Sequence, residues 1–425
     1  MVYPLRNDKR LDFRTVADFH MFAPYTDSYQ PPQFVKSIHI DLNKRLSTIV
    51  PLLAEEIRAG LAAELDTATD TAQGSLCRNP KDLTLKLTAR AVSRIAVGAT
   101  HIKSSNEWLE SLIQYPTDVF GAGIKLLRWP SFLRPIAKLF IPEFQRLRHV
   151  RRLVRAQLAP VYAQARRDQR ATGESVPKCL DDDTLMSWVW RNSREQDRTD
   201  AYQSQAVLFL TLPALYTTAL GVAQALIDLA AYPQYLPMIR DEFGKGLSEG
   251  NGVLSRAALD NMVKMDSFIK ESQRINPLTL VSFERKTKDA VALGDGTKLP
   301  KGAYVAAPAY HIGMDPSHHS SPDEFDGLRF WKLREQASTT GETPDIDPFR
   351  YDTASETHLH FGLGRHACPG RFVAGIWTKL VLGFVAMNYD VSVPGSEGKR
   401  PSSVIINTFF EIPPSSQISL RSRVA

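Results

Sequence analysis

The sequence predicts a mainly α-helical protein with a smaller β-rich part, and three observations carry this prediction. Between about residues 40 and 335, apolar residues recur at intervals of three and four, which is the period of an amphipathic helix. After Pro277 the pattern changes to short β-type runs separated by turns that contain Gly and Pro. The chain has 425 residues, of which 43% are apolar and 23% charged, so it can bury a large core.

The helical body contains one stretch, residues 206–231, that is apolar enough to resemble a membrane span. It includes Pro213, Tyr216, Gln224 and Asp228, and a spanning segment tolerates few such groups. We therefore expect a long buried core helix in this place.

The β-rich part is expected at residues 280–283, 290–293 and 304–307, where the turn sequences GDG and PKG separate the runs. Residues 166–183 and 337–357 are polar and lack a period, which predicts irregular loops. No internal repeat and no strong boundary are evident, so we expect one domain over residues 1–425.

Composition excludes several classes of protein. The three cysteines are odd in number and lack CxxC spacing, which indicates neither a disulfide framework nor a zinc site. The net charge is +6, but the arginine cluster at 146–155 has no interleaved aromatic residues, so we expect no nucleic-acid partner. The N-terminus lacks the apolar run of a signal peptide or membrane anchor.

The most informative segment is HFGLGRHACPGRF, residues 360–372. Cys368 stands before Pro369, a residue suited to the first position of a helix, so we expect Cys368 to be the N-cap. The unpaired N–H groups and dipole of a helix N-terminus stabilise a thiolate, the form in which cysteine binds a metal. The glycines allow sharp turns and a close approach of the backbone to a flat group. The alternative is a buried structural cysteine in a glycine-rich turn.

Phe361, Gly364, His366, Cys368 and Gly370 match the pattern Phe-x-x-Gly-x-[Arg/His]-x-Cys-x-Gly. This pattern resembles the haem-binding signature of the cytochrome P450 family, and the resemblance extends over about residues 10–420. It implies a cytochrome P450-like helical fold with a small β-rich subdomain, haem b as cofactor and Cys368 as the axial ligand of the iron. It also implies that His366 contacts a haem propionate.

The family also has a Glu-x-x-Arg pair on the helix before the small sheet. Five such pairs occur here, and on a helix most are solvated ion pairs. Glu271 and Arg274 alone have the family's context, in a helix that stops before Pro277 and 97 residues before Cys368. By resemblance they form a structural triad with Arg329, and Arg285 in the run SFERKT binds a propionate.

The apolar helix at 206–231 resembles the family's central helix, whose signature is [Ala/Gly]-Gly-x-[Asp/Glu]-Thr-[Thr/Ser]. Here the segment reads PALYTT, so the glycine and the acid are absent and Tyr216 stands where the carboxylate would be. Thr217 takes the place of the threonine that assists proton delivery. A phenol is a poorer proton relay than a carboxylate, and we hypothesise that Tyr216 or an ordered water partly substitutes. The alternative for both residues is plain core packing.

The resemblance implies a haem-thiolate monooxygenase that oxidises an apolar small molecule with O₂ and electrons from an NADPH-dependent flavoprotein reductase. It is closest in style to fungal enzymes of secondary metabolism, which favours a terpenoid or meroterpenoid-type substrate. It places the protein at the endoplasmic reticulum membrane surface. This chain has no anchor, so membrane association is uncertain and a cytoplasmic location is the alternative.

Two other functions are weighed against this one. The chain is shorter at its N-terminus than typical relatives and lacks opening strands of the small sheet, so it could be a non-catalytic remnant of the fold. The missing acid beside Thr217 agrees with a haem-dependent isomerase or dehydratase that adds no oxygen atom.

Overall fold

A computed structural model describes residues 2–66, 75–99, 106–181, 183–340, 347–395 and 399–423. Contacts divide the chain into two compact units. The first, here called the C-terminal unit, comprises Met1–Phe13, Leu53–Leu87 and Thr217–Ala425. The second, the middle unit, comprises Arg14–Leu52 and Thr88–Tyr216. Each unit is described by itself.

The core of the C-terminal unit is built on helix α17 (Arg371–Asn388), in which every residue from Gly375 to Ala386 is buried. A helix that is apolar on all sides has to be covered on all sides. Helices α12 (Leu236–Glu249) and α14 (Val263–Ile275) pack against it. A Cβ atom at Gly383 would lie 2.0 Å from the ring of Phe243, so only glycine allows α12 and α17 to approach this closely.

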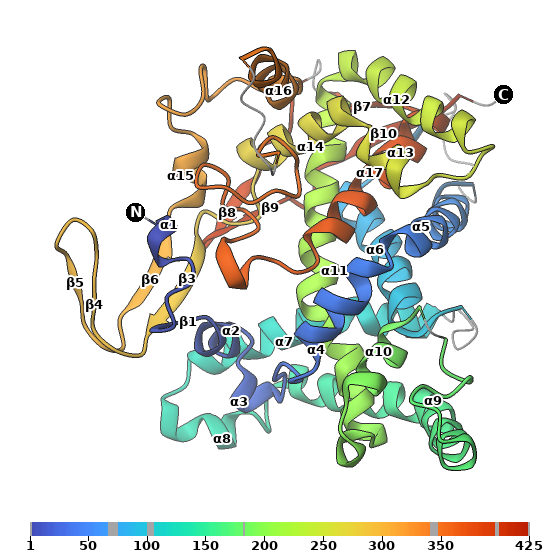
Figure 1. Cartoon of the computed structure of the whole chain (residues 1–425), viewed down its shortest axis with the longest axis vertical. Coiled ribbons are helices and arrows are strands. Elements are labelled where there is room, and N and C mark those ends of the chain that lie inside the picture. Colours follow the sequence, from blue (N-terminus) through green and yellow to red (C-terminus); the bar gives the residue numbers. More distant parts are fainter. Residues whose placement is uncertain are drawn as a thin grey trace. The chain divides into compact units, whose positions relative to one another are not determined.

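The strands of the C-terminal unit form small antiparallel sheets. In the first, β3 (Ser282–Thr287) lies between β1 (Leu11–Asp12) and β6 (Tyr304–Ala307) (Figure 1). The strands expected after Pro277 are therefore present, with the first displaced by two to four residues. Two residues of β1 occupy one side of β3, so β3 has a partner on each side.

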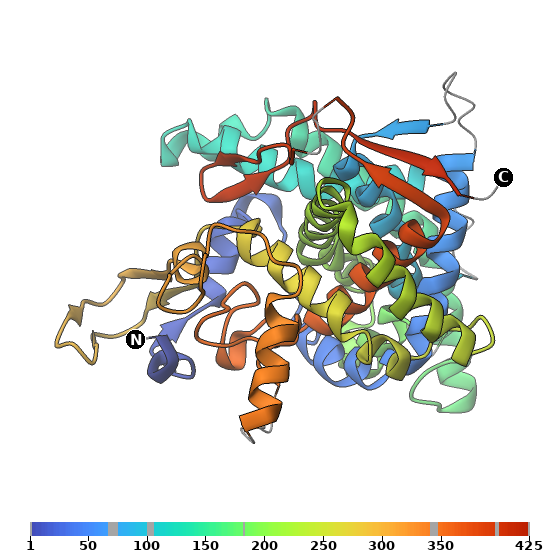
Figure 2. The ribbon, with the colours of Figure 1, turned by 90° about the horizontal axis from the view of Figure 1, so that it is seen from above.

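The second sheet joins segments that are far apart in the sequence. Strand β10 (Ile418–Ser422) pairs with β2 (Ser75–Arg78) on one side and β7 (Tyr389–Ser392) on the other. Figure 2 shows the red strands of the C-terminal segment beside the blue strand β2. Two-stranded ribbons are formed by β4 (Val291–Ala292) with β5 (Lys298–Leu299), and by β8 (Val404–Ile406) with β9 (Phe409–Glu411).

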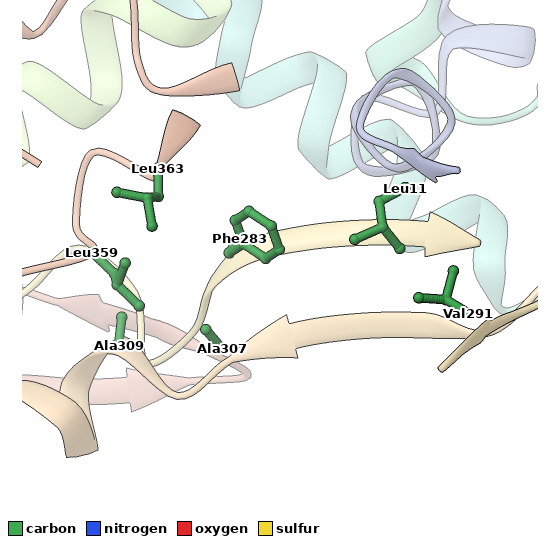
Figure 3. Close-up of a cluster of buried hydrophobic side chains, with 7 residues drawn as sticks. All are labelled: Leu11, Phe283, Val291, Ala307, Ala309, Leu359 and Leu363. Atoms are coloured by element: carbon green, nitrogen blue, oxygen red, sulfur yellow. The ribbon is translucent and has the colours of Figure 1, made fainter. Parts of the chain in front are cut away.

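A cluster of buried side chains joins the first sheet to the glycine-rich segment that precedes α17 (Figure 3). Phe283 of β3 lies at its centre, and Leu359 and Leu363 reach it from the glycine-rich segment. The strands therefore fix the start of the segment that carries Cys368. The other members of the cluster are Leu11, Val291, Ala307 and Ala309.

The middle unit is helical apart from its connections. Helices α7 (Asn106–Leu127) and α9 (Pro142–Thr172) pack side by side. Arg146, in the arginine cluster of α9, donates to the buried carboxylate of Asp118 on α7 at 2.6 Å. Helix α9 continues through residues 166–172, so the loop expected from residue 166 is wrong in this part, because the helix ends only at Gly173 in a left-handed cap with φ of 71°.

Helix α11 (Asp200–Ala231) has residues in both units. It is the one described helix with the length and hydropathy of a membrane span, and 67% of that window is buried inside the protein. This burial agrees with the expected core helix. Pro213 lies inside α11 and has no N–H to donate to the carbonyl group of residue 209.

Helix α16 (Arg329–Thr340) extends into the loop expected at 337–357. That expectation is wrong for residues 337–340, because the helix that begins at Arg329 continues through a polar, exposed end. Residues 341–346 lie outside the described residues, and 347–357 contain only turns and a short bridge. The remaining elements are α1 (Val2–Leu5), α2 (Arg14–His20), α3 (Ala23–Thr26), α4 (Phe34–Lys36), η1 (Ser37–Leu42), α5 (Leu46–Leu61), η2 (Ala62–Asp66), α6 (Pro80–Val97), η3 (Ser131–Leu133), α8 (Arg134–Ala137), α10 (Leu185–Asn192), η4 (Glu195–Asp197), η5 (Pro233–Tyr235), α13 (Arg256–Asp260), α15 (Ala309–Gly313) and η6 (Gly364–His366).

Candidate functional site

The segment before α17 is a tight loop, here called the cysteine loop (residues 359–370), whose turns need glycine. Gly362 and Gly364 have φ angles of 71° and 72°, a region that other residues rarely adopt. A Cβ atom at Gly364 would also lie 2.5 Å from the carbonyl oxygen of Arg6. The N–H of Cys368 donates to the carbonyl oxygen of Phe361 at 2.7 Å and closes the loop.

Cys368 is not the N-cap of the following helix. Gly370 is the N-cap and α17 begins at Arg371, so the sequence prediction is wrong by two residues. The physical reason is the bond from the Cys368 N–H to Phe361, which keeps Cys368 in the loop, while the first helical bond runs from Ala374 to Gly370.

The Cys368 thiol nevertheless lies at the helix N-terminus. Burial raises the pKa of Cys368, and the N–H groups of Gly370 and Arg371 together with the Arg371 charge oppose this rise. Cys368 as a whole residue is partly exposed. A positively charged metal ion at the sulfur would add a stronger opposing effect and favour the thiolate.

Arg285 and His366 lie beside the cysteine loop. Arg285 of β3 is buried, stacks on Phe283 at 4.2 Å from the ring centroid, and donates from Nη1 to the Glu284 carbonyl oxygen at 2.8 Å. Burial, followed by the charge of Arg365, lowers the pKa of Arg285 to about 10. His366 accepts a hydrogen bond from Arg365 Nε at 3.0 Å, and burial followed by Arg285 and Arg365 lowers the pKa of His366 to about 4.

Glu271, Arg274 and Arg329 meet in one buried group. Arg274 donates from Nε and Nη2 to the two carboxylate oxygens of Glu271, each at 2.8 Å, and Arg329 Nε donates to the same oxygens at 3.0 and 3.1 Å. The remaining guanidinium nitrogens of Arg274 and Arg329 donate to backbone carbonyl oxygens of residues 313–324. All three side chains are buried, so each arginine depends on the shared carboxylate.

Sequence reasoning missed two residues, Arg371 and Asn7, that fix the loop. Arg371 donates from Nη1 to the Cys368 carbonyl oxygen at 2.9 Å and from Nε to the Asp352 carbonyl oxygen at 3.0 Å. The Asn7 side chain accepts from the Arg365 N–H at 2.9 Å. Arg371 follows Cys368 closely in the run CPGRF, and this nearness is a signal for the Arg371–Cys368 bond. No sequence pattern connects Asn7 to Arg365, which lies 358 residues away.

The residues around Cys368 fit a flat, anionic, metal-bearing group. Gly370 has an ordinary φ of −88°, and a Cβ atom there would meet nothing within 4 Å, so no protein contact requires glycine at this position. Arg285 Nη2 is buried and makes no hydrogen bond to any residue that the structure describes. A free cationic donor and an uncovered backbone beside a cysteine are what propionates and a tetrapyrrole ring would use.

Tyr216 and Thr217 lie next to each other on α11, and both side chains are half-buried. The boundary between the units falls between them. Their proton-relay roles stay predictions.

The model of the family described as "Cytochrome P450" matches residues 34–416. The chain belongs to the cytochrome P450 family. It is 30% identical over 95% of its length to cytochrome P450 monooxygenase BOA4 of Botryotinia fuckeliana, covering 78% of that protein. It is 32% identical over 99% of its length to cytochrome P450 monooxygenase pyr3 of Aspergillus fumigatus, covering 78% of it. It is 28% identical over 90% of its length to the ent-kaurene oxidase of Gibberella intermedia, covering 69%.

These matches show that the chain has the mainly helical P450 fold and is a cytochrome P450 monooxygenase, which is a kind of oxidoreductase. The family implies a haem cofactor, a redox partner that supplies electrons and hydrophobic substrates. Fungal members of the family are often associated with membranes.

Proposed function

We propose that this P450 monooxygenase binds haem b through Cys368 and oxidises an apolar fungal secondary metabolite of the terpenoid or meroterpenoid type. The cysteine loop is the observation that carries the proposal, since its two left-handed glycines and closed turn hold the sulfur at a helix N-terminus. When bound, the haem supplies oxygen activation and the insertion of one oxygen atom into a C–H bond.

In this proposal the protein binds and orients the cofactor. Cys368 is the iron ligand, and the N–H groups of Gly370 and Arg371 stabilise its negative charge. Arg285 and His366 hold the propionates, with the buried Nη2 of Arg285 as a free donor. Phe361, Gly364 and Gly370 shape the loop, and Glu271, Arg274 and Arg329 brace the elements behind it, all within one P450-like domain.

Thr217 and Tyr216 are proposed to hold a proton near the reacting oxygen. The hydroxyl of Thr217 is the donor, and Tyr216 or a water resupplies it in place of the usual acid. In a Thr217→Ala variant we expect slower product formation and more hydrogen peroxide per NADPH consumed. Unchanged values for both would remove Thr217 from the mechanism.

The relatives, which include an ent-kaurene oxidase, support the proposed substrate class. We propose an NADPH-dependent flavoprotein reductase at the endoplasmic reticulum membrane surface as the electron donor. A redox-neutral isomerase or dehydratase is the second candidate, favoured by the phenol of Tyr216 at the position of the acid. The mass of the product separates the two, because a monooxygenase adds one oxygen atom, about 16 mass units, to its substrate, whereas an isomerase leaves the mass unchanged.

The decisive experiment is a carbon monoxide difference spectrum of the reduced protein. We expect the thiolate-type signal in the wild type and in Cys179→Ser, and its loss in Cys368→Ser. Cys179 is a matched control because it is a second partly buried thiol. A thiolate signal that survives in Cys368→Ser would overturn the assignment, and no haem uptake by the wild type would favour the remnant.

A further inference from the structure

Residues 6–13, here called the clamp segment, connect the strand of Arg285 to the cysteine loop. Strand β1, within this segment, pairs with β3, which carries Arg285. Leu11 of the segment and Leu363 of the loop belong to the same buried cluster (Figure 3). The clamp segment is therefore fixed against both parts of the chain that carry a proposed propionate partner.

Arg365 of the cysteine loop is held by the clamp segment at two points. Its backbone N–H donates to the side-chain oxygen of Asn7 at 2.9 Å, and its Nη2 donates to the carbonyl oxygen of Asp8 at 3.2 Å. Its Nε donates to Nε2 of His366 at 3.0 Å. One arginine thus connects the clamp segment to the imidazole of His366.

The bond from Arg365 decides which ring nitrogen of His366 carries the proton. A guanidinium group has only donors, so Nε2 has to accept and cannot carry a hydrogen. The imidazole then has its hydrogen on Nδ1, and Nδ1–H is the only ring N–H that it can donate. A propionate needs a donor, so the bond from Arg365 determines which edge of the ring can bind it.

Phe13, the last residue of the clamp segment, contacts both proposed propionate partners. Its ring centroid lies 5.5 Å from that of His366, and the Arg285 guanidinium carbon lies 5.2 Å from the Phe13 centroid. The same guanidinium lies 4.2 Å from the centroid of Phe283. A cation over an aromatic face is attracted to the ring, so Phe13 helps to keep Arg285 beside His366. The two donors thus lie around one side chain, as binding of one anionic group requires.

We infer that Arg365 and Asn7 are positioning residues of the haem site, because Arg365, held by Asn7, fixes His366 as the tautomer with its hydrogen on Nδ1. In the other tautomer, Nδ1 would present a lone pair, which repels a carboxylate oxygen. The propionate part of this inference rests on the proposed function, whereas the tautomer and the clamp contacts do not.

The test compares Arg365→Met, Arg365→Lys and Asn7→Ala in the haem-bound protein, with Lys9→Met as the control. Methionine removes every side-chain donor of Arg365, and lysine keeps the charge and one donor group. Lys9 is an exposed cation of the clamp segment, so its variant matches the change of charge. The ring ¹⁵N chemical shifts of His366 in the diamagnetic ferrous carbon monoxide complex, assigned with His366→Gln, report the tautomer. The rate of haem transfer to apomyoglobin reports how firmly the cofactor is held.

In the wild type we expect one tautomer, with the hydrogen on Nδ1. Arg365→Met should give both tautomers and about tenfold faster haem transfer, since one hydrogen bond to a charged group is lost. Asn7→Ala should cause a smaller change of the same kind. Arg365→Lys should restore most of the wild-type shifts, and Lys9→Met should change neither measurement.

Ring shifts that stay constant in Arg365→Met would overturn the inference even if haem transfer became faster, because a merely structural arginine would have that effect. A wild-type hydrogen on Nε2 would overturn it as well. Altered shifts with a constant transfer rate would overturn the link to the propionate. A wild type that takes up no haem would overturn the proposed function and that link together, and the ring shifts of the haem-free protein would still decide whether Arg365 sets the tautomer.

Discussion

Helix α14 carries two buried charge networks on different sides, and they differ in how much each depends on its carboxylate. Glu271 and Arg274 lie on one side and Ser272 and Asn276 on another, since successive residues turn by about 100°. The first network, with Arg329, lies behind the cysteine loop. In the second, Asp228 of α11 accepts from Ser272, Asn276 and Arg400, and Arg400 holds the segment before the β8–β9 hairpin.

The carboxylates of Glu271 and Asp228 differ in the number of arginines that donate to them. Glu271 accepts from two arginines that are 0% and 9% exposed, and from the N–H of Asp326 at 3.1 Å. Asp228 faces one arginine, Arg400, which is 14% exposed and keeps carbonyl and amide acceptors besides. Burial raises the pKa of Asp228 in spite of Arg400. The Glu271 network therefore supports the fold, whereas the Asp228 network fixes the position of one chain segment.

The largest difference between the two networks is expected when each carboxylate is neutralised in turn. Glu271→Gln leaves two buried guanidinium groups against an amide, which costs about 3–5 kcal/mol of unfolding free energy and removes haem binding. Asp228→Asn keeps the shape and leaves Arg400 with its other acceptors, so we expect a loss of about 1–3 kcal/mol and retained haem. Urea unfolding followed by circular dichroism, with the carbon monoxide spectrum, measures both. Equal losses would show that the networks have the same role.

The first network could be predicted from the sequence because order along the chain carries information. Glu143 and Arg146 of α9 have the same Glu-x-x-Arg spacing, yet they form a partly exposed group with Lys125 of α7. The position of Glu271 before Pro277 and before Cys368 separated it from such pairs. The local pattern of glycines likewise predicted the cysteine loop, because left-handed turns require specific residues.

The second network could not be predicted, since its partners have no fixed spacing. Asp228 and Arg400 are 172 residues apart, and Asn7 reaches Arg365 across 358. The N-cap was placed at Cys368 because Pro369 favours a helix start, whereas the long-range closure with Phe361 decided otherwise. The ends of α9 and α16 were missed because polar residues continue an exposed helix without leaving a periodic signal.

The second prediction separates glycines needed by the protein from one needed by its cofactor. Gly364→Ala places a Cβ against the Arg6 carbonyl at a φ of 72°, so we expect a loss of about 2–4 kcal/mol in unfolding free energy. Gly370→Ala meets open space, so stability should stay constant while haem content falls. Chemical unfolding and the ratio of haem to protein absorbance check this. A Gly370→Ala variant with full haem content would contradict the fit of this loop to a flat group.

The third prediction concerns pH on the Arg274 side of α14. Burial, followed by the charges of Lys270 and Arg274, lowers the pKa of His360 to about 3, and among the described residues His360 Nε2 has no hydrogen-bond partner. Unfolded histidine binds a proton near pH 6.5, so this stability is complete above about pH 6.5 and falls as the pH drops toward 3.

At pH 5 the loss from His360 alone is about 2 kcal/mol, at 1.36 kcal/mol per pH unit below 6.5. His360→Phe removes the titrating group and should reduce the decrease in unfolding free energy between pH 7 and pH 5, measured by urea unfolding, by that amount. His149→Gln, an exposed histidine of α9, is the control and should keep the wild-type slope. Parallel stability curves for wild type and His360→Phe would show that His360 takes up its proton equally in the folded and unfolded states, and the acid sensitivity would then belong to the neighbouring buried His358 and His319.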